Sequence, residues 1–574
     1  MSIFRRLFAA ERGSIMVLAA LSLTAVMGMS GLAVEVGTGY ATKTRNQRVA
    51  DMAALGAALA YQANSSTNEA TQTAKDIVAA SGLPVSAATV SFPSTGVQVQ
   101  ITTAVPVRLA SLITNVASYN VNNSAIASLG INNSPACVMA LSSNATNGVA
   151  IKGNSTLNNP GCAVVSNSPV SVQGSSQLTA TKITAPSIES TGSSTIKGTQ
   201  ATGSSATDPL SSNAALAAAF AKLGVTTPMN PPTFTVSSTN WSFPSSSGAF
   251  AALAATDPVK ANCTLSGQIY SCNQGTYNIN NLTVPSGYTV TFSGTSTVSV
   301  YGALSANGAT LNGSQATYNF RNSFGTGWSS SPTFGDIASL YVGGSVGYSG
   351  NGNSIGAGKV VINGTLSVGG ASSLTIGAGT HIFGGISVSG SGLLTIGDGD
   401  LSVAGDISTQ GNSTINFGAG EHSIDGNVSI QGGGTMGAGL YLIDGNFDKN
   451  ASQTVTATDV TIVASGSFST GGSSGFILTA PETGNSAHGG IPNIALASKT
   501  SLDSSIGGSS SNTIGGIIYL PNSNLSVSGA GSVAGATCMA VVVNTLSVTG
   551  SGGINNNACT APPLSSGSSV ALIQ

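Results

Sequence analysis

A repeat of about twenty residues in the second half of the chain constrains the fold more than any other feature. An apolar residue followed by Gly, then Ala or Asp, then Gly starts at Ile355, Ile376, Ile396, Phe417 and Met436, at spacings of 21, 20, 21 and 19 residues. A second glycine keeps step, at Gly364, Gly385, Gly405, Gly426 and Gly445. Short alternating runs such as Leu-Thr-Ile lie between them. This period predicts the coils of a parallel β-solenoid. A sandwich of stacked hairpins is the alternative, and the two co-moving glycines favour the solenoid.

The composition fits an exported β-rich protein. Charged residues make up 6% of the 574 residues, against about 25% in an ordinary soluble protein. Gly accounts for 75 residues, yet Val, Ile and Leu recur throughout, which disordered chains lack. Six of the seventeen Lys and Arg lie in residues 1–48, and the others are scattered singly. We therefore expect no nucleic-acid partner.

The stretch SIMVLAALSLTAVMGMSGLAVEV, residues 14–36, predicts a membrane span. Ile15 to Val34 is twenty residues without a charge, about 30 Å as a helix and so long enough to cross a bilayer. A secretory signal has a shorter apolar core followed by a small-residue cleavage site. Gly31-Leu32-Ala33 fits such a site, so cleavage remains the alternative to retention. Three basic residues on each side leave the orientation undecided.

The cysteines indicate the compartment. Six of them form three sequential couples: Cys137 with Cys162, Cys263 with Cys272, and Cys538 with Cys559. Six cysteines allow fifteen pairings, of which neighbour pairing is the simplest, and six buried free thiols are the alternative. No zinc-finger spacing surrounds them, so we expect no metal. Disulfides require an oxidising compartment. This places the bulk of the chain in the periplasm, with a cytoplasmic N-terminus and a single pass through the inner membrane.

Two helical segments and a small α/β module follow the span. The stalk, residues 37–64, carries Ala50, Ala53, Ala54, Ala57 and Ala58 at close spacing. Small residues let helices approach closely. The stalk therefore packs on its own domain or, alternatively, self-associates or bundles with partners. Within residues 65–130 the pattern predicts a helix over TNEATQTAKDIVAASG, capped by Thr67 or Asn68, then a strand, a short helix over VRLASLITNV and a second strand.

Residues 31–60, GLAVEVGTGYATKTRNQRVADMAALGAALA, resemble the N-terminal segment of the TadE/TadG-like proteins of Tad (Flp) pilus assembly. That segment joins an Arg-rich tip, an apolar helix, a basic stretch and an alanine-rich helix. Residues 137–168 resemble a further segment of the TadG-like proteins, and residues 479–491 and 515–529 do so more weakly. Pilins of this broad class carry Glu five residues after the cleaved Gly, whereas Leu18 stands at that distance from Gly13. The resemblance therefore implies an assembly component rather than the processed main subunit. No von Willebrand A metal motif is legible.

The predicted organisation has eight parts: a basic tip (1–13), the span (14–36), the stalk (37–64), the α/β module (65–130), a β-rich extracytoplasmic region (131–208), a helix with a Pro-rich linker (209–260), the β-solenoid (261–562) and a tail (563–574). The helix lies in SSNAALAAAFAKLG, residues 211–224, with Ser211 or Ser212 as its cap. Pro228, Pro231 and Pro232 follow, which marks a boundary between two β-rich regions. We expect the couple Cys538 and Cys559 to close the C-terminal end of the solenoid.

No catalytic, cofactor-binding or metal-binding residue can be assigned. Asp425 and Asp444 occupy matching coil positions, as paired carboxylates for glycoside cleavage would, but each stands in an Asp-Gly-Asn turn signature. Gly397-Asp398-Gly399-Asp400 is not a calcium-binding nonapeptide. His381 and His422 share a column with Leu401 and Tyr441, which is typical of packing rather than of a metal ladder. His488 is isolated.

The sequence thus predicts a membrane-anchored structural component of Tad-type pilus assembly, without cofactors. Its expected partners are the membrane and other pilus-assembly proteins. A surface adhesin that uses the solenoid as its binding face is the alternative, and a polysaccharide-active enzyme is a third.

Overall fold

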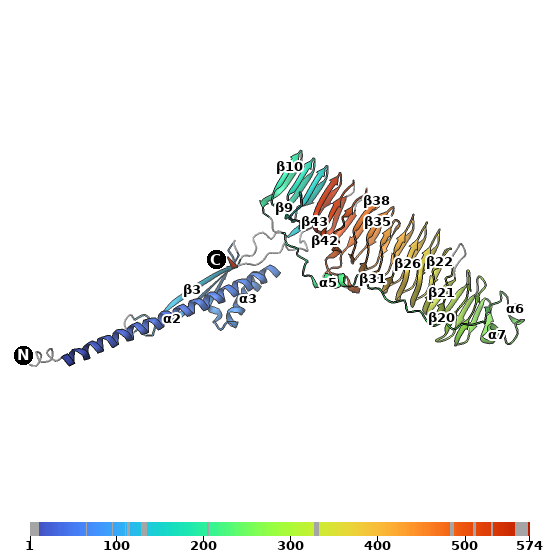
Figure 1. Ribbon diagram of the computed structural model, residues 1–574, viewed down its shortest axis with the longest axis horizontal. Helices are drawn as coiled ribbons and strands as arrows, with labels where there is room; N and C mark the ends of the chain where they lie inside the picture. Colours follow the sequence, from blue (N-terminus) through green and yellow to red (C-terminus); the bar gives the residue numbers. More distant parts are fainter. Residues whose placement is uncertain are drawn as a thin grey trace, which may run out of the picture. The chain divides into compact units, whose positions relative to one another are not determined.

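The chain folds into two units. Figure 1 shows its computed structural model. One unit comprises residues 1–133 and 567–574, and the other residues 134–566. The described residues are 11–64, 66–93, 96–108, 111, 115–127, 135–203, 206–325, 332–482, 487–508, 512–529, 532–556, 559 and 572–573. Residues 1–10 of the predicted tip, most of the predicted tail and half of the short helix predicted over VRLASLITNV lie outside them.

The first unit is built on one long helix. α2 (Glu11–Asn64) runs without a break through the predicted span and stalk. Its C-terminal half packs on α3 (Thr67–Ala80) and on an antiparallel sheet of order β1-β2-β3-β45. The sheet strands are β1 (Ala88–Ser91), β2 (Val97–Pro106), β3 (Ser118–Ala127) and β45 (Leu572–Ile573), with the 3-10 turn η1 (Val85–Ala87) before β1. The cap of α3 is Ser66, whose hydroxyl accepts the Glu69 amide, rather than Thr67 or Asn68.

The alanine row of the stalk lies inside this unit. Ala50, Ala53, Ala54, Ala57 and Ala58 are fully buried, in one cluster with Val97, Val99 and Ile101 of β2 and with Ala70, Ala74 and Val78 of α3. Small side chains let the sheet approach the helix closely, because a larger residue would hold the backbones apart. The row is therefore not an exposed surface for a second helix, and the structure favours packing on its own domain.

The second unit is a parallel β-solenoid of about 18 turns, which confirms the predicted fold class. At roughly 4.8 Å per turn it is about 85 Å long. Its N-terminal strands are β4 (Ala136–Ala140), β5 (Val149–Gly153), β6 (Thr156–Asn159), β7 (Ala163–Ser166), β8 (Val170–Gly174), β9 (Gln177–Ala185), β10 (Ile188–Gly192) and β11 (Thr195–Thr202).

The remaining strands of the solenoid follow in chain order after residue 240. They are β12 (Trp241–Ser242), β13 (Cys263–Ser266), β14 (Ile269–Cys272), β15 (Thr276–Ile279), β16 (Leu282–Thr283), β17 (Thr289–Phe292), β18 (Thr297–Val300), β19 (Leu304–Ser305), β20 (Thr310–Phe320), β21 (Thr333–Val342), β22 (Val346–Tyr348), β23 (Asn353–Ile355), β24 (Lys359–Val368), β25 (Ser373–Ile376), β26 (His381–Val388), β27 (Leu393–Ile396), β28 (Leu401–Val403), β29 (Ile407–Thr409), β30 (Thr414–Phe417), β31 (Gly420–Ile424), β32 (Val428–Ile430), β33 (Gly433–Met436), β34 (Gly439–Ile443), β35 (Phe447–Ala451), β36 (Val455–Ala457), β37 (Val460–Ala464), β38 (Phe468–Gly472), β39 (Phe476–Thr479), β40 (Ile494–Ser498), β41 (Ser504–Ile506), β42 (Asn512–Val527), β43 (Ser532–Gly550) and β44 (Gly553–Asn555), with the 3-10 turn η2 (Ala487–Gly489) between β39 and β40.

The sequence repeat is the stacking register of the coils. Ile355 pairs with Ile376, Ile376 with Ile396, Ile396 with Phe417 and Phe417 with Met436, each one coil apart. Each of these side chains is buried, in a core that is continuous along the solenoid. The side chains at the apolar position of the repeat therefore form a column that points into the core. Each step of one repeat along the sequence corresponds to a step of one coil along the solenoid axis.

The two glycines of each Gly-x-Gly sequence are required for different physical reasons. A Cβ on Gly397 would lie 2.7 Å from backbone atoms of Gly377 and Ala378 in the preceding coil, so there is no room for a side chain. Gly399 has φ +136°, a conformation that L residues avoid. The second glycine column differs by one residue from the prediction, because Gly384, rather than Gly385, stacks between Gly364 and Gly405.

The coils are not stacked in chain order. β5 pairs with the C-terminal part of β43, and β6 with β44, so the N-terminal coils continue the solenoid beyond its C-terminal ones. Figure 1 shows this as cyan coils beside the red ones. The regions 131–208 and 261–562, predicted as separate, thus share one sheet. The couple Cys538 and Cys559 does not close an open end, because it lies at the junction of the two runs.

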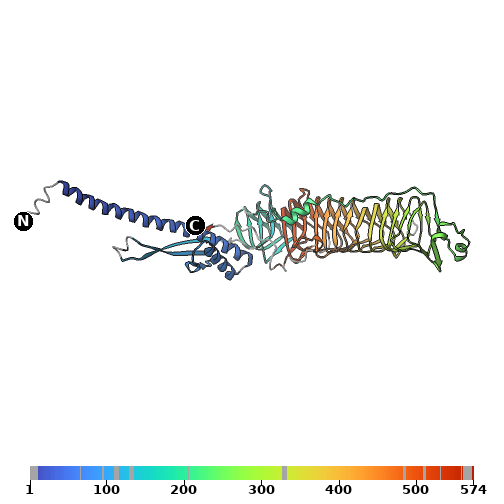
Figure 2. The same cartoon turned by 90° about the horizontal axis from the view of Figure 1, so that it is seen from below.

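Residues 206–240, which we call the strap, connect these two runs along the outside of the solenoid (Figure 2). Asp208 accepts the Tyr519 hydroxyl at 2.8 Å, Lys222 pairs with Glu421 at 2.7 Å, and the Thr227 amide donates to the Ser402 hydroxyl at 2.8 Å. Farther along, Phe234 packs on Tyr341. The predicted linker is therefore a segment bound to one face of the solenoid rather than a boundary.

The strap holds α5 (Ala214–Ala221) against an outward apolar patch. Leu216 and Ala219 cover Leu440, Leu442 and Val463, and these residues are buried. The N-cap of α5 is Asn213, one or two residues after the predicted Ser211 or Ser212, because its side chain accepts the Leu216 amide at 3.0 Å.

The two ends of the solenoid differ. At one end α6 (Ser247–Ala251), α7 (Pro258–Asn262) and the antiparallel pair β13–β14 lie over an aromatic cluster that contains Trp241 and Tyr270. At the other end β10 pairs with β8 and β11 with β9, and among the described residues neither has a second neighbour. Glu189 and Lys197 are exposed on these edge strands, and charges at edges oppose unspecific pairing.

Candidate functional site

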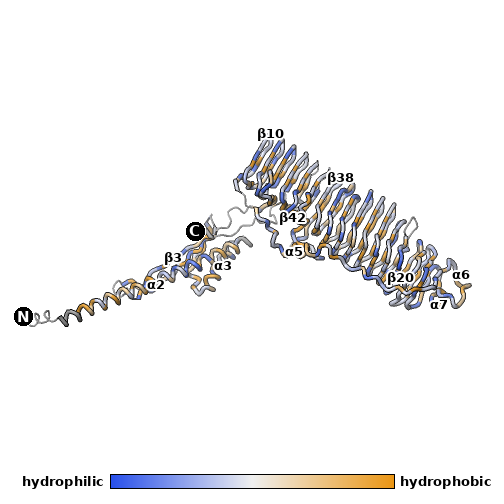
Figure 3. The backbone as a smooth tube through the Cα atoms, in the orientation of Figure 1, coloured by the Kyte–Doolittle hydropathy of each residue, from blue (hydrophilic) through white to orange (hydrophobic). Residues whose placement is uncertain are grey.

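The N-terminal half of α2 is long and apolar enough to cross a membrane, and only 6% of its most apolar window is buried within the protein. Its apolar side chains point outward all round, with Met16 79%, Leu21 63% and Met29 72% exposed. Figure 3 shows this as orange along the bare part of the helix. An apolar surface of this size is stable in a bilayer and costly in water.

Polar contacts begin where the charge-free stretch ends. The Arg108 amide donates to Glu35 Oε1 at 2.9 Å, which ties the β2–β3 hairpin to the helix one residue after Val34. Higher on the helix, Arg45 donates to the carbonyl of Ser81 at 2.8 Å and so satisfies the C-terminal end of α3. Asn46 is fully buried and donates to Thr103 Oγ1 at 2.7 Å. The basic stretch of the stalk thus positions the sheet and α3 on the helix.

All six cysteines lie in disulfides, formed between sequence neighbours: Cys137–Cys162, Cys263–Cys272 and Cys538–Cys559. The second joins β13 to β14 at the covered end of the solenoid. The first and third come together where the chain enters and leaves the solenoid, with 3.6 Å between the sulfurs of Cys137 and Cys559. Nothing in the spacing of the sequence indicated that these two couples meet.

Asn556 completes this cysteine cluster. It is fully buried; its Nδ2 donates to the Met539 carbonyl at 2.7 Å and lies 3.1 Å from Cys137 Sγ, and its Oδ1 accepts the Met539 amide. Cys137, Cys162 and Cys559 bring three sulfurs within 4.8 Å of one another, the only such grouping among the described residues. These sulfurs are engaged in disulfides, so the cluster ties the two chain ends of the solenoid and offers no thiolate to a metal.

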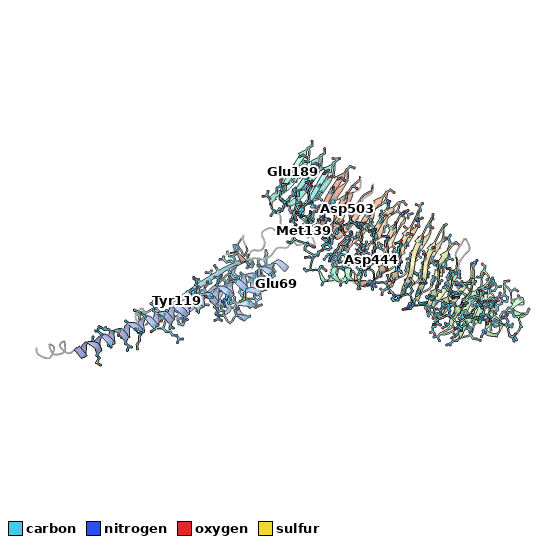
Figure 4. The ribbon with its side chains drawn as sticks, in the orientation of Figure 1. Glu69, Tyr119, Met139, Glu189, Asp444 and Asp503 are labelled. Carbon is cyan, nitrogen blue, oxygen red and sulfur yellow. A yellow bond between two sulfur atoms is a disulfide. The ribbon has the colours of Figure 1, made fainter. Side chains whose placement is uncertain are left out.

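The acidic candidates stack as the repeat implies. The pairing of Ile424 with Ile443 places Asp425 and Asp444 on neighbouring coils, and both are exposed; Figure 4 labels Asp444 on the solenoid surface. The ladder in this turn is formed by the next side chains along: Asn427 Oδ1 accepts the Asn446 amide, and Asn446 Oδ1 accepts the Ser467 amide. The aspartates therefore flank a structural ladder that the asparagines of the two Asp-Gly-Asn turns form.

The Gly-Asp-Gly-Asp turn is also part of a ladder. Asp398 Oδ1 accepts the Ala419 amide at 2.8 Å, and Asp400 Oδ1 accepts the Glu421 amide at 3.2 Å. Each carboxylate thus stabilises the backbone of the following coil, at a place where an unpaired amide would otherwise face solvent.

The histidines form a buried column. His381 pairs with Leu401, Leu401 with His422, and His422 with Tyr441. Burial lowers the pKa of both His381 and His422 to about 4, although a hydrogen bond from His422 Nε2 to the Gly418 carbonyl opposes this shift. Both imidazoles are therefore neutral at pH 7. Leu401 separates them by one coil, so they do not form a contiguous ligand pair.

Two charged side chains have roles that sequence reasoning missed. Lys449 is fully buried within the coil stack, donates to the Ser474 carbonyl, and burial lowers its pKa. Lys222 pairs with Glu421 and holds the strap in place. The position of Lys449, in a column with Ile430 and Thr470, is the one signal that it points inward.

Comparison with known proteins finds a family match for the residues of α2. Residues 13–60 match the family model Tad, described as "Putative Flp pilus-assembly TadE/G-like". No curated protein and no solved structure matches the chain. The matched residues are those of the bare apolar half of α2 together with the half that packs on the sheet. Residues 13–60, which lie almost entirely in the long helix, are therefore similar to the TadE/G-like segment that this family model describes.

Proposed function

We propose that the protein is an extracytoplasmic structural component of Tad/Flp-type pilus assembly, held in the inner membrane by a single helix with its N-terminus in the cytoplasm. The solenoid is the arm that this anchor presents to other pilus-assembly proteins. The protein acts by holding and positioning partners, and it is not an enzyme.

One observation carries the proposal: the TadE/G-like match coincides with α2. The match ends at residue 60, four residues before the helix ends, and covers the whole charge-free stretch Ile15–Val34. The family likeness and the apolar surface thus describe the same structural element, so the pilus-assembly segment of this chain is also its membrane anchor.

The disulfides support the orientation. Three disulfides, two of them buried at the junction of the solenoid, suit a chain that folds in an oxidising compartment. A chain with a single span then keeps its N-terminal tip, with Arg5, Arg6 and Arg12, on the cytoplasmic side.

The surface of the solenoid supports a structural role. This surface is hydrated mainly by hydroxyl and amide groups rather than by charged groups. The carboxylates of Asp398 and Asp400 stabilise the backbone of neighbouring coils. Stacked coils with a continuous core form a stiff rod, because each coil is hydrogen-bonded to both neighbours. A stiff rod suits the holding of partners at fixed distances from one another along its own length.

Genetic complementation tests this function. We expect deletion of the gene in its source organism to abolish Flp-type pili and the full chain to restore them. A chain that carries a cleavable secretion signal in place of residues 1–36 reaches the same compartment without the anchor, and we expect it to fail. Normal piliation in the deletion strain would contradict the proposal. Fractionation separates the adhesin alternative, which predicts the protein on the outer surface or in the medium instead of the inner membrane.

A further inference from the structure

The end of the β2–β3 hairpin lies level with the end of the charge-free stretch of α2. β2 and β3 pair up to Pro106 and Ser118, and the Val107 amide then donates to the Ala117 carbonyl at 3.0 Å. The next residue, Arg108, is bonded through its amide to Glu35. Glu35 follows Val34 directly, about 1.5 Å farther along the helix axis, so the hairpin meets the helix at its last apolar turn.

A second contact fixes the hairpin in this position. The Tyr119 hydroxyl lies so close to Gly39 that a Cβ at residue 39 would overlap it. In Figure 4, Tyr119 lies alongside α2 in the same unit. Glycine at position 39 leaves room for the Tyr119 side chain, so β3 lies against the helix one turn beyond Glu35.

The side chains at the hairpin end suit a lipid headgroup layer. Val116 is 47% exposed and Tyr119 38% exposed, although both are apolar or aromatic, and the Arg108 side chain is exposed beside them. On the helix at the same level, Tyr40 is 74% exposed. Tyr and Arg are the residues that concentrate at membrane interfaces, where an aromatic ring and a cation each find a polar and an apolar neighbour.

We infer that this hairpin end, formed by residues 107–108 and 115–119, rests in the lipid headgroup layer and is a second membrane contact of the protein. The inference rests on the proposal that Ile15–Val34 spans a bilayer, since that span sets the height of Glu35. The contact fixes how the first unit sits on the membrane, because a helix alone leaves its tilt free and a second point of attachment restricts it.

Tryptophan placed at three heights tests this inference in the full chain. Val116→Trp marks the hairpin end and Leu21→Trp, at a 63% exposed position, marks the span. Leu59→Trp, at a 51% exposed position on the same helix, is the control, about 36 Å beyond Glu35. Each variant is reconstituted into phosphatidylcholine–phosphatidylglycerol vesicles with lipids brominated near the headgroup or near the methyl end. The emission of the wild-type protein, which contains Trp241 and Trp328, is subtracted.

We expect lipids brominated near the headgroup to quench the added emission of Val116→Trp more than lipids brominated near the methyl end. The added emission of Leu21→Trp should be quenched most by lipids brominated near the methyl end. The added emission of Leu59→Trp should be unchanged by either lipid. Quenching of Leu21→Trp alone would overturn the hairpin contact and leave the anchor intact. No quenching of any variant would overturn the anchor itself. Equal quenching of Val116→Trp and Leu59→Trp would show the whole unit lying on the membrane, which would also overturn the inference.

Discussion

Replacing the buried histidines should change how the stability of the solenoid depends on pH. His422 is 1% exposed and His381 fully buried, inside a column whose other members are Leu401 and Tyr441. Leu401 shows that leucine fits this column. The variant His422→Leu therefore removes the titrating group without changing the packing scheme, and His381→Leu does the same two coils away.

The size and sign follow from the pKa of each histidine, which burial lowers from 6.5 to about 4. Below pH 6.5 the unfolded chain binds a proton that the folded chain excludes, so stability is complete above pH 6.5 and falls as the pH decreases toward 4. Each histidine then lowers the free energy of unfolding by about 2 kcal/mol at pH 5 and by about 3 kcal/mol at pH 4, relative to its value above pH 6.5. A chain that keeps both loses about 4 kcal/mol between pH 7.5 and pH 5 from this source.

Urea unfolding of the full chain in detergent, followed by far-ultraviolet circular dichroism at pH 7.5 and pH 5, measures this effect. The quantity compared is the difference in the free energy of unfolding between the two pH values. Each of His422→Leu and His381→Leu should reduce this difference by about 2 kcal/mol. His488→Leu, at an exposed histidine, is the matched control, and each buried-histidine variant should reduce the difference by more than this control does.

An unchanged pH difference in both buried-histidine variants would refute this reasoning. It would mean that the imidazoles reach water in the folded protein, and that the column from His381 to Tyr441 is not packed as described.

Three further predictions follow from the same packing. Gly397→Val should prevent the coils from stacking, because the valine side chain would meet the backbone of the preceding coil. Gly248→Ala is the control, because a Cβ at residue 248 meets no atom within 4 Å, and this variant should unfold at the wild-type urea midpoint. Phe468→Ala should reduce the free energy of unfolding by about 3–5 kcal/mol, because Phe468 is fully buried and stacks on Phe447 at 5.4 Å; a loss below about 1 kcal/mol would contradict a close-packed core. Asp425→Asn combined with Asp444→Asn should leave both circular dichroism and pilus restoration unchanged, and loss of piliation with an intact fold would revive the enzyme alternative.

The sequence predicted the elements whose signal is periodic. The columns from Ile355 to Met436 and from His381 to Tyr441 could be read directly, because one coil adds a nearly constant number of residues and parallel pairing places equal positions above one another. The span Ile15–Val34 could be read for a similar reason, since the bilayer requires an unbroken apolar length.

The order of the coils could not be predicted from the sequence. The pairing of β5 with β43 joins residues about four hundred positions apart, and the run Val149–Gly153 looks like any other coil. The helix within residues 211–224 could be predicted, but the path of the strap along the solenoid could not, because its contacts, such as Lys222 with Glu421, are made by single side chains. The meeting of Cys137 with Cys559 follows from that hidden stacking and not from their spacing.

The contact of the β2–β3 hairpin with α2 likewise could not be predicted from the sequence. Gly39 and Tyr119 carry no motif, and only the folded unit shows that one makes room for the other. The hydrogen bond to Glu35 is donated by the Arg108 backbone amide, so the residue type at position 108 does not predict it.

The central claim is that the TadE/G-like helix stays in the membrane and carries the solenoid. Alkaline carbonate extraction of membranes, combined with the intact mass of the protein, tests it most directly. We predict a polypeptide that includes Ile15–Val34 and remains entirely in the membrane pellet. A protein released into the supernatant, with a mass that places its first residue near Val34, would contradict the claim.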